Sequence, residues 1–413
     1  MKLQMKDASP EVIKISLITA ICLVGDSMLY IALPIFWNEV GLDSLWQVGI
    51  LLSINRFIRL PSNPIIGWIY KRISLKTGLL IAVSLGALTT LGYGIVSGFL
   101  GWLILRSLWG IAWSFFRIGG LATVTTYSTD GNVGKTMGLY NGLYRLGSLV
   151  GMLVGGILTP IIGLKNVSLL LGAFSLLAFI YLFASFRVKD TNKQSASVNQ
   201  TTRFSIVRIL RGSYLLFISS FFISLLFQGI ITSTLSPLIG YLYEDSIFFI
   251  GMIVSVTALS GLLQAARWVW EPFLASWIGS ISDGVKGRLP IYVGSLLFSS
   301  ITVALLPFSV SIYIWVFVCL LVLISATSLT TLTDAIASDE AKKTDSVTFF
   351  TGYTIVQDVG AAMGPFLSYL VITLPFGFPV LFVSSSVLLL MFAVFWFMHS
   401  KTQTIAKTKT QSM

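Results

Sequence analysis

Apolar stretches of membrane-spanning length follow one another along almost the whole chain. A helix needs about 20 consecutive apolar residues to cross the hydrocarbon core of a bilayer, so we predict one membrane helix in each stretch. The predicted spans are residues 12–37, 46–70, 77–97, 100–127, 136–162, 166–186, 214–242, 247–280, 289–310, 313–336, 347–374 and 377–398. The first stretch is too long for a signal peptide and lacks a small-residue cleavage site, so we expect it to be retained.

The polar connections between these stretches alternate in charge. One set is basic and contains Lys2, Lys6, Lys14, Lys71, Arg72, Lys76, Lys135, Lys286, Arg288, Lys342, Lys343, Lys401, Lys407 and Lys409. The other set contains Glu39, Asp43, Lys165, Glu244 and Asp245. Basic connections stay in the cytoplasm, so this alternation predicts an even number of spans with both termini cytoplasmic.

The longest connection is basic, and it divides the chain. We predict an N-terminal six-helix half over residues 1–186, a cytoplasmic linker over 187–213 and a C-terminal six-helix half with a basic tail over 214–413. The linker segment from Phe204 to Leu210 fits a short amphipathic surface helix and equally a flexible linker.

Composition narrows the class of protein. The chain has 413 residues, of which 55% are hydrophobic and only 10% charged, whereas soluble domains have roughly 25% charged residues. We therefore expect an integral multi-pass protein in contact with the lipid bilayer. Two further expectations do not follow from composition, namely a location in a bacterial inner membrane and a monomeric state. The net charge of +11 lies in alternate connections, so we predict no nucleic-acid partner.

Candidate chemistry is sparse outside the charged residues. Cys22 and Cys319 lie in apolar runs, and the single histidine, His399, ends the last span. We therefore predict no metal site and no cofactor. The chain has no phosphate-binding Gly-x-x-x-x-Gly-Lys-Ser/Thr loop and no nucleophile beside a base, so we expect neither an ATP-driven pump nor an enzyme.

Charged residues nevertheless occur inside the predicted spans. They are Asp26, Arg56, Arg59, Arg106, Arg117, Arg145, Arg267, Glu271 and Asp358. A charge at bilayer depth costs at least about 2.5–3.5 kcal/mol on insertion scales, so these residues indicate a polar cavity inside the protein. Arginines outnumber acids in this set.

The two predicted halves carry matching patterns. Arg and Pro keep one spacing in two segments, Arg56 to Pro61 before Gly67 and Arg267 to Pro272 before Gly279. Two glycines four residues apart follow an internal charge in each half, as Arg145 before Gly147 and Gly151, and as Asp358 before Gly360 and Gly364. These matches predict two halves of the same orientation, the parallel repeat of a large class of transporters.

Several segments resemble motifs of the major facilitator superfamily, and the resemblance covers nearly the whole chain. The loop motif Gly-x-x-x-Asp-Arg-x-Gly-Arg-Arg is similar to Gly67-Trp68-Ile69-Tyr70-Lys71-Arg72, with Lys71 in place of the acid, and to Gly279 to Asp283 followed by Lys286, Gly287 and Arg288. The span-four motif Arg-x-x-x-Gly resembles Arg106 to Gly110, and the antiporter motif resembles Gly147, Gly151, Gly155 and Gly156, with Met152 in place of proline.

The resemblance implies an all-α membrane fold of twelve helices in two pseudo-symmetric six-helix halves. It also implies gating or packing roles for Gly67, Arg72, Gly147, Gly151, Gly155, Asp283 and Arg288. In proton-coupled members of the family an acid in span one works with the span-four arginine, so the resemblance implies that Asp26 and Arg106 couple transport to protons. The alternative for this pair is a static structural ion pair.

The candidate substrate-binding residues are Arg56, Arg59, Arg145, Arg267, Glu271 and Asp358, whereas Arg117 lies nearer the cytoplasmic end of its span, where its side chain can reach the membrane surface. Arg56 and Arg59 are three residues apart on one helix face, and arginine cannot deprotonate, so either acids from other spans or a substrate anion must neutralise them. Arg267 matches Arg56 in the other half and can also pair with Glu271, four residues later. We expect Arg145 and Asp358 to form an ion pair across the halves.

Three functions remain in competition. The leading hypothesis is proton-coupled efflux of a small organic solute, anionic or amphipathic, by alternating access. The alternative is an uptake or exchange carrier for an organic anion. A membrane receptor or lipid scramblase fits the matched halves and internal charges less well.

Overall fold

The computed structural model describes residues 9–127, 133–185, 213–243, 246–283, 287–341 and 346–411. The first group of elements is α2 (Pro10–Ala32), η1 (Trp37–Val40), α3 (Leu45–Phe57), α4 (Arg59–Tyr70), α5 (Leu75–Ile95), α6 (Phe99–Tyr127) and α7 (Val133–Ser185). The second group is α9 (Tyr214–Ile223), η2 (Ser224–Ile230), α10 (Ile231–Tyr243), β1 (Ser246–Phe249), β2 (Met252–Ser255), α11 (Val256–Ser282), α12 (Arg288–Leu305), α13 (Ile312–Ala341), α14 (Ser346–Ile372) and α15 (Gly377–Gln411).

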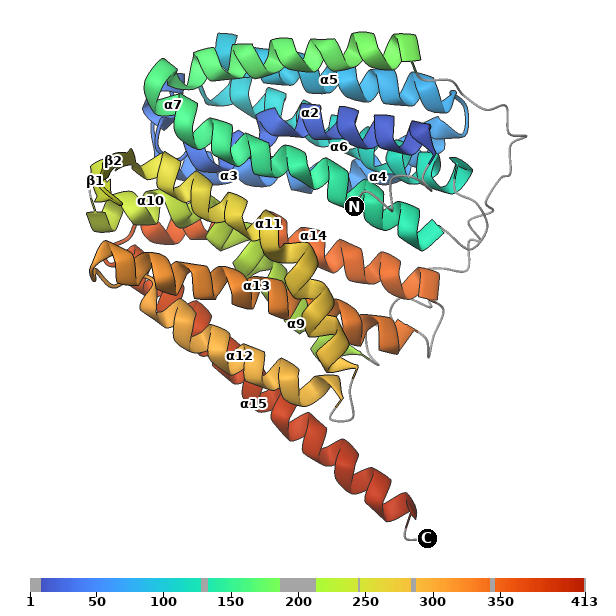
Figure 1. Ribbon diagram of the computed structural model, residues 1–413, viewed down its shortest axis with the longest axis vertical. Helices are drawn as coiled ribbons and strands as arrows, with labels where there is room; N and C mark the ends of the chain where they lie inside the picture. Colours follow the sequence, from blue (N-terminus) through green and yellow to red (C-terminus); the bar gives the residue numbers. More distant parts are fainter. Residues whose placement is uncertain are drawn as a thin grey trace.

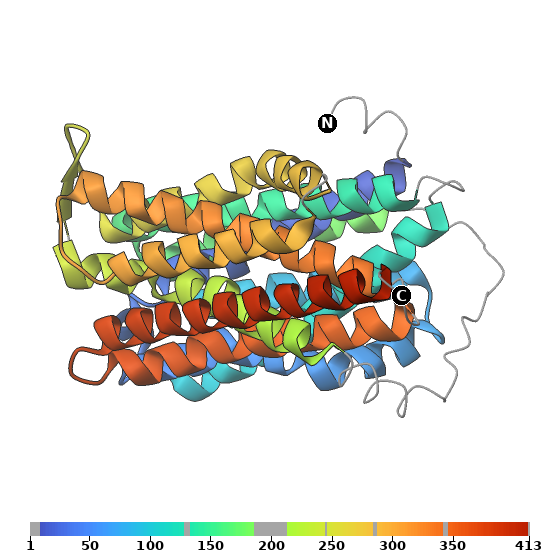
Figure 2. The same ribbon diagram turned by 90° about the horizontal axis from the view of Figure 1, so that it is seen from below.

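The two groups of helices form two neighbouring bundles (Figure 1), with α2 to α7 in one and α9 to α15 in the other. The axes of the long helices lie roughly parallel or antiparallel to one another, and the β1–β2 hairpin lies at one end (Figure 2). Helix α2 begins and α15 ends at the opposite end. We call these the hairpin end and the termini end. The predicted linker, residues 187–213, including the segment from Phe204 to Leu210, lies outside the described residues except for Ser213.

Several predicted spans are interrupted. Helix α7 contains the predicted spans 136–162 and 166–186, which meet at Gly163, whose φ of 81° and ψ of 155° are not helical. The predicted span 46–70 divides at Ile58 into α3 and α4. In the described residues, nine helices are long and apolar enough to cross a membrane. The number of twelve spans therefore stays a prediction.

A short antiparallel sheet corrects the prediction of an all-α chain and of a span that begins at 247. Strands β1 and β2 pair Phe249 with Met252, and the two residues between them both have positive φ, 49° at Ile250 and 77° at Gly251. Positive φ at both central residues is the requirement of a tight type I′ hairpin turn. The apolar run Ile247 to Val254 is rich in aromatic and β-branched residues, which favour strands, so the helix begins only at Val256.

Glycines set the distance between α2 and α7. A Cβ atom on Gly147 or Gly151 would collide with the α2 backbone at Ala20 or Val24. At Gly155 it would lie 2.5 Å from Cβ of Met28. Small residues allow helices to approach this closely, so the three glycines have the packing contacts predicted for them.

The same arrangement recurs in the second bundle. A Cβ atom on Gly360 would collide with the carbonyl oxygen of Phe221, and one on Gly364 would collide with Leu225 and Gly229. Helix α14 thus packs on α9 and η2 as α7 packs on α2. The glycine pairs predicted as repeats from the sequence occupy corresponding positions in the two bundles.

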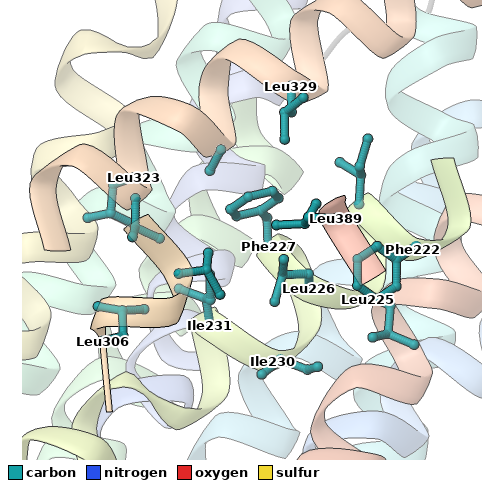
Figure 3. Close-up of a cluster of buried hydrophobic side chains, with 14 of the residues drawn as sticks. Phe222, Leu225, Leu226, Phe227, Ile230, Ile231, Leu306, Leu323, Leu329 and Leu389 are labelled. Carbon is teal, nitrogen blue, oxygen red and sulfur yellow. The ribbon is translucent and has the colours of Figure 1, made fainter. Parts of the chain in front are cut away.

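The two bundles have similar helix contacts but different side chains at their centres. Counting from the glycine contacts, the position that corresponds to Asp26 in the second bundle is Phe227. Phe227 is buried together with Leu226, Ile231 and Leu323 in a hydrophobic cluster (Figure 3). The segment around it, η2, is π-helical, and Thr232 Oγ1 donates to the Phe227 carbonyl at 2.9 Å. The charged centre of the molecule therefore belongs to the first bundle.

We expect Gly151→Ala to lower the stability of the purified protein, because the added methyl group would push α7 away from Val24. Overpacking of this kind costs about 1–3 kcal/mol. Gly142→Ala is the matched control, since nothing lies within 4 Å of its Cβ position. Thermal unfolding in detergent should show a lower Tm for Gly151→Ala only. Equal Tm values for the two variants would contradict the packing role of Gly151.

Candidate functional site

A buried ion pair lies at the centre of the first bundle. Arg106 Nη1 on α6 donates to Asp26 Oδ1 on α2, and both side chains are almost completely buried. Arg106 Nε donates to the Leu51 carbonyl of α3 at 2.9 Å, and Asn55 Nδ2 of α3 lies 3.4 Å from the same Asp26 oxygen. The predicted pairing of Asp26 with Arg106 is present, and it joins three helices at one point.

The pair is incompletely satisfied. In the described residues, Arg106 Nη2 and Asn55 Oδ1 are buried without hydrogen-bond partners. The Tyr30 ring lies 6.0 Å from the Arg106 guanidinium. The Tyr93 hydroxyl is also buried without a partner and acts electrostatically on Arg106. Unsatisfied buried groups cost free energy, so this cluster is held in place at the expense of stability.

Arg56 and Arg59 lie one turn apart where α3 passes into α4. Arg59 Nε donates to the Asn55 carbonyl at 3.1 Å, and its guanidinium lies 5.4 Å from the centre of the Trp113 ring. Arg56 interacts electrostatically with Tyr30, Asp358 and Asp26. Asp358 on α14 also acts on Arg59, so this group crosses from one bundle to the other.

A second cross-bundle group corrects the expected pairing of Arg145 with Asp358. Arg145 Nη1 on α7 donates instead to Glu271 Oε1 on α11 at 2.7 Å, and Arg267 Nε lies 3.6 Å from Glu271 Oε2. Arg145 and Asp358 occupy corresponding places in the repeat, but α7 faces α11 and α14 faces α3. Arg145 therefore meets α11, whereas Asp358 acts on Arg56 and Arg59.

Asp334 on α13 belongs to this second group and was missed in the sequence. Its Oδ1 accepts hydrogen bonds from the Tyr353 hydroxyl at 2.7 Å and from Gln357 Nε2 at 3.2 Å. It acts electrostatically on Arg145. The signal was available, because Asp334 is an acid inside the predicted span 313–336. Asn55 had only the weaker signal of a polar residue in an apolar span.

Arg117, on the same helix as Arg106, faces α7. Its Nη1 lies 3.3 Å from the Tyr144 hydroxyl and 3.5 Å from Asn141 Oδ1. Its polar contacts are therefore with neutral groups of the first bundle.

The residues of the two loop motifs have different surroundings. In the second bundle, Arg288 Nη2 lies 2.8 Å from Asp283 Oδ1, and Arg288 Nε lies 2.6 Å from Asp339 Oδ2, so the start of α12 is tied to α11 and α13. In the first bundle, Arg72 lies over the Trp68 ring at 3.8 Å, and no atom lies within 4 Å of the Cβ position of Gly67. In the described residues, the copy of the loop motif in the second bundle therefore forms ion pairs, through Arg288.

The two bundles touch closely toward the hairpin end. A Cβ atom on Gly156 of α7 would lie 2.5 Å from the Thr257 carbonyl of α11, and Thr257 Oγ1 donates to the Gly156 carbonyl at 3.0 Å. A Cβ atom on Gly49 of α3 would lie 2.9 Å from the Pro365 carbonyl of α14. Backbone contacts close this end at two places.

Toward the termini end, several glycines of the two bundles have no close neighbour. Nothing lies within 4 Å of the Cβ positions of Gly67, Gly138, Gly142 and Gly279. The Arg145 side chain is 46% exposed even though it reaches across to Glu271. The cross-bundle ion pair is therefore partly accessible, unlike the Asp26–Arg106 pair.

We expect a double-mutant cycle on Arg145→Ala and Glu271→Ala to show coupling, because each variant leaves the other charge without its partner. Coupling energies of contacting pairs are about 0.5–3 kcal/mol. The measurement is the free energy of unfolding in detergent. The matched control is the cycle on Arg145→Ala and Asp358→Ala, which should be additive. Additivity in the first cycle would mean that the observed ion pair contributes nothing.

Comparisons with known proteins agree with this architecture. Residues 15–271 match the family model of the Major Facilitator Superfamily. The solved structure of a bacterial homolog of the human lysosomal transporter Spinster, inward-facing and unoccupied, is similar with a TM-score of 0.75 and 15% identity, covering 95% of this chain and 96% of that one. The nucleoside transporter NupG gives a TM-score of 0.74 with 12% identity, covering 94% and 98%.

Relatives in sequence are transporters. The multidrug resistance protein MdtG of Proteus mirabilis is 27% identical over 257 residues, which is 59% of this chain and 62% of MdtG. The multi-drug resistance efflux pump PmrA of Streptococcus pneumoniae is 22% identical over 274 residues, 64% of this chain and 62% of PmrA. The synaptic vesicular amine transporter of Rattus norvegicus is 27% identical over 171 residues, 40% of this chain and 33% of that protein.

The matched part of the chain thus spans from a third to about three-fifths of these relatives. The family model, by contrast, covers more than half of this chain, and the fold agrees with it over nearly the full length. The chain, an integral multi-pass membrane protein and not an enzyme, belongs to the major facilitator superfamily of transporters.

Proposed function

We propose that this protein is a proton-coupled secondary transporter that exports a small organic solute across a bacterial cell membrane by alternating access. The single observation that carries the proposal is the buried Asp26–Arg106 pair, which stands at the centre of only one of two similar bundles. The proposed topology has twelve spans, counting α3 with α4 and α9 with η2 and α10 as one each and α7 as two, with both termini cytoplasmic.

The charges of the connections support this orientation. Lys71 and Arg72 lie between α4 and α5 at the termini end, and Lys76 lies in the first turn of α5. Glu39 and Asp43 lie between α2 and α3 at the hairpin end. Basic connections remain in the cytoplasm. The termini end, where the Arg145–Glu271 bridge is partly exposed, is then the cytoplasmic end.

The chemistry of the pair supports proton coupling. Arg106 always carries its charge, so only Asp26 can change the net charge of the cluster. When Asp26 is ionised, the guanidinium is neutralised in place. When Asp26 takes up a proton, Arg106 loses its counter-charge inside the membrane and must find another, so the protonation state and the helix arrangement are linked.

Two ion-pair groups suit roles in the change of conformation. The Arg145–Glu271 bridge joins α7 to α11 across the bundles and has to break or re-form when they rock against each other. The Asp283–Arg288–Asp339 group lies within the second bundle and keeps α11, α12 and α13 together. Names of the relatives MdtG and PmrA, a multidrug resistance protein and an efflux pump, support export as the direction.

An uptake or exchange carrier for an organic anion is the second candidate. The observation that favours it is that Arg56 and Arg59 lie beside the Asp26–Arg106 pair without forming an ion pair in the described residues. An imposed pH gradient separates the two candidates. It drives solute movement in a proton-coupled exporter and has no direct effect on anion exchange.

We expect Asp26→Asn to abolish solute-driven proton movement in proteoliposomes, because the cluster loses its titrating group. The measurement is the signal of an internal pH-sensitive dye when the amphipathic solute that wild type moves fastest is added. Asp43→Asn is the matched control, since Asp43 is exposed near the hairpin end, and it should behave like wild type. Normal proton movement in Asp26→Asn, with the protein folded, would remove Asp26 from the coupling mechanism.

A further inference from the structure

The arginines inside the protein are not neutralised equally. In the described residues, a carboxylate lies at ion-pair distance from Arg106, from Arg145 and from Arg267. Arg56 and Arg59 have no such partner, although they are one turn apart and both always charged. Two like charges at this spacing repel each other, so their position beside a buried ion pair is costly unless an anion joins them.

The surroundings of the two arginines leave donor groups free. In the described residues, Arg56 Nε is buried without a hydrogen-bond partner, and the first neighbour that acts on this guanidinium is the Tyr30 phenol, which can accept a hydrogen bond from it. Arg59 uses its Nε for the Asn55 carbonyl and lies near the Trp113 ring, so its Nη groups remain. Two guanidiniums beside aromatic rings suit a carboxylate attached to an apolar body.

In the described residues, the carboxylates near Arg56 and Arg59 form no ion pair with either arginine. Asp26 is held by Arg106. Asp358 on α14 acts on both Arg56 and Arg59 but stands beyond ion-pair distance from either in the described residues. The acids of the second group are also occupied, Glu271 by Arg145 and Arg267, and Asp334 by Tyr353 and Gln357.

We propose that Arg56 and Arg59 form the subsite for the anionic group of an amphipathic carboxylate, and that Asp358 is the internal carboxylate with which this solute competes. The inference rests on the transport function proposed above and specifies its substrate class. With the solute absent, Asp358 of the other bundle is the acid that attracts the two arginines. A bound carboxylate replaces that attraction with direct charge-assisted hydrogen bonds. This substrate class is opposite in charge to the amines for which the vesicular relative is named.

The competition predicts opposite effects for the arginine variants and the aspartate variant. Arg56→Gln and Arg59→Gln should each weaken binding of a carboxylate, because a charge-assisted hydrogen bond is lost. Asp358→Asn should strengthen it, because the competing negative charge is removed. A gain in affinity does not arise from misfolding, so Asp358→Asn keeps the test valid if the two arginine variants unfold.

The probes are benzoate, neutral benzamide and cationic benzylammonium, which share one ring and differ in charge. Their affinities for the purified full-length protein are measured from the rise in Tm with ligand concentration, since a ligand of the folded state stabilises it. We expect benzoate to bind more tightly than the other two. The apparent Kd for benzoate should rise about tenfold or more in Arg56→Gln and Arg59→Gln and fall in Asp358→Asn.

Arg117→Gln is the matched control for loss of an arginine between the helices, since Arg117 contacts the neutral groups of Asn141 and Tyr144. It should leave the benzoate affinity unchanged. The proposal is overturned if benzamide binds as tightly as benzoate, if benzylammonium is preferred, or if Asp358→Asn weakens benzoate binding. Because this assay contains no pH gradient, its failure leaves proton coupling by Asp26 standing, and a failure of the coupling test leaves the subsite standing.

Discussion

Neither Asp26 nor Arg106 can remain buried without the other, because a lone charge in a membrane interior is far more costly than a paired one. The pair fixes the relative positions of α2, α3 and α6, since Arg106 also binds the Leu51 carbonyl. Helix α2 in turn packs closely against Gly147, Gly151 and Gly155 of α7 on its other side. The arrangement of the first bundle therefore follows from one electrostatic requirement combined with one steric requirement.

The two bundles share a scaffold but not a chemistry. Their glycine contacts correspond, whereas Asp26 in one corresponds to Phe227 in a hydrophobic cluster of the other. Arg267 repeats the place of Arg56 in the sequence, yet it is neutralised by Glu271 within its own helix. The repeat thus supplies two similar bundles, and the buried Asp26–Arg106 pair lies in the first of them.

Much of this architecture could be predicted from the chain. Lengths of apolar runs located the helices, and spacing of Gly147, Gly151, Gly360 and Gly364 located the repeated contacts. The Asp26–Arg106 partnership came from a resemblance to known transporters. The partner of Arg145 could not be predicted, because it depends on how far the bundles are rotated at the termini end. The hairpin before α11 could not be predicted either, because a short apolar strand and an apolar helix segment have the same composition.

The contacts that close the hairpin end have an entropic consequence. At Gly156 and Gly49 one partner has no side chain, and the other contributes the carbonyl oxygens of Thr257 and Pro365, the Thr257 hydroxyl and the Tyr369 side chain. Long side chains lose rotamer freedom of up to about 2 kcal/mol each when an interface orders them, whereas glycine has none to lose. Each of these contacts therefore orders side chains on only one of its two sides. Closing this end costs less conformational entropy than closing an interface between two rows of long side chains would.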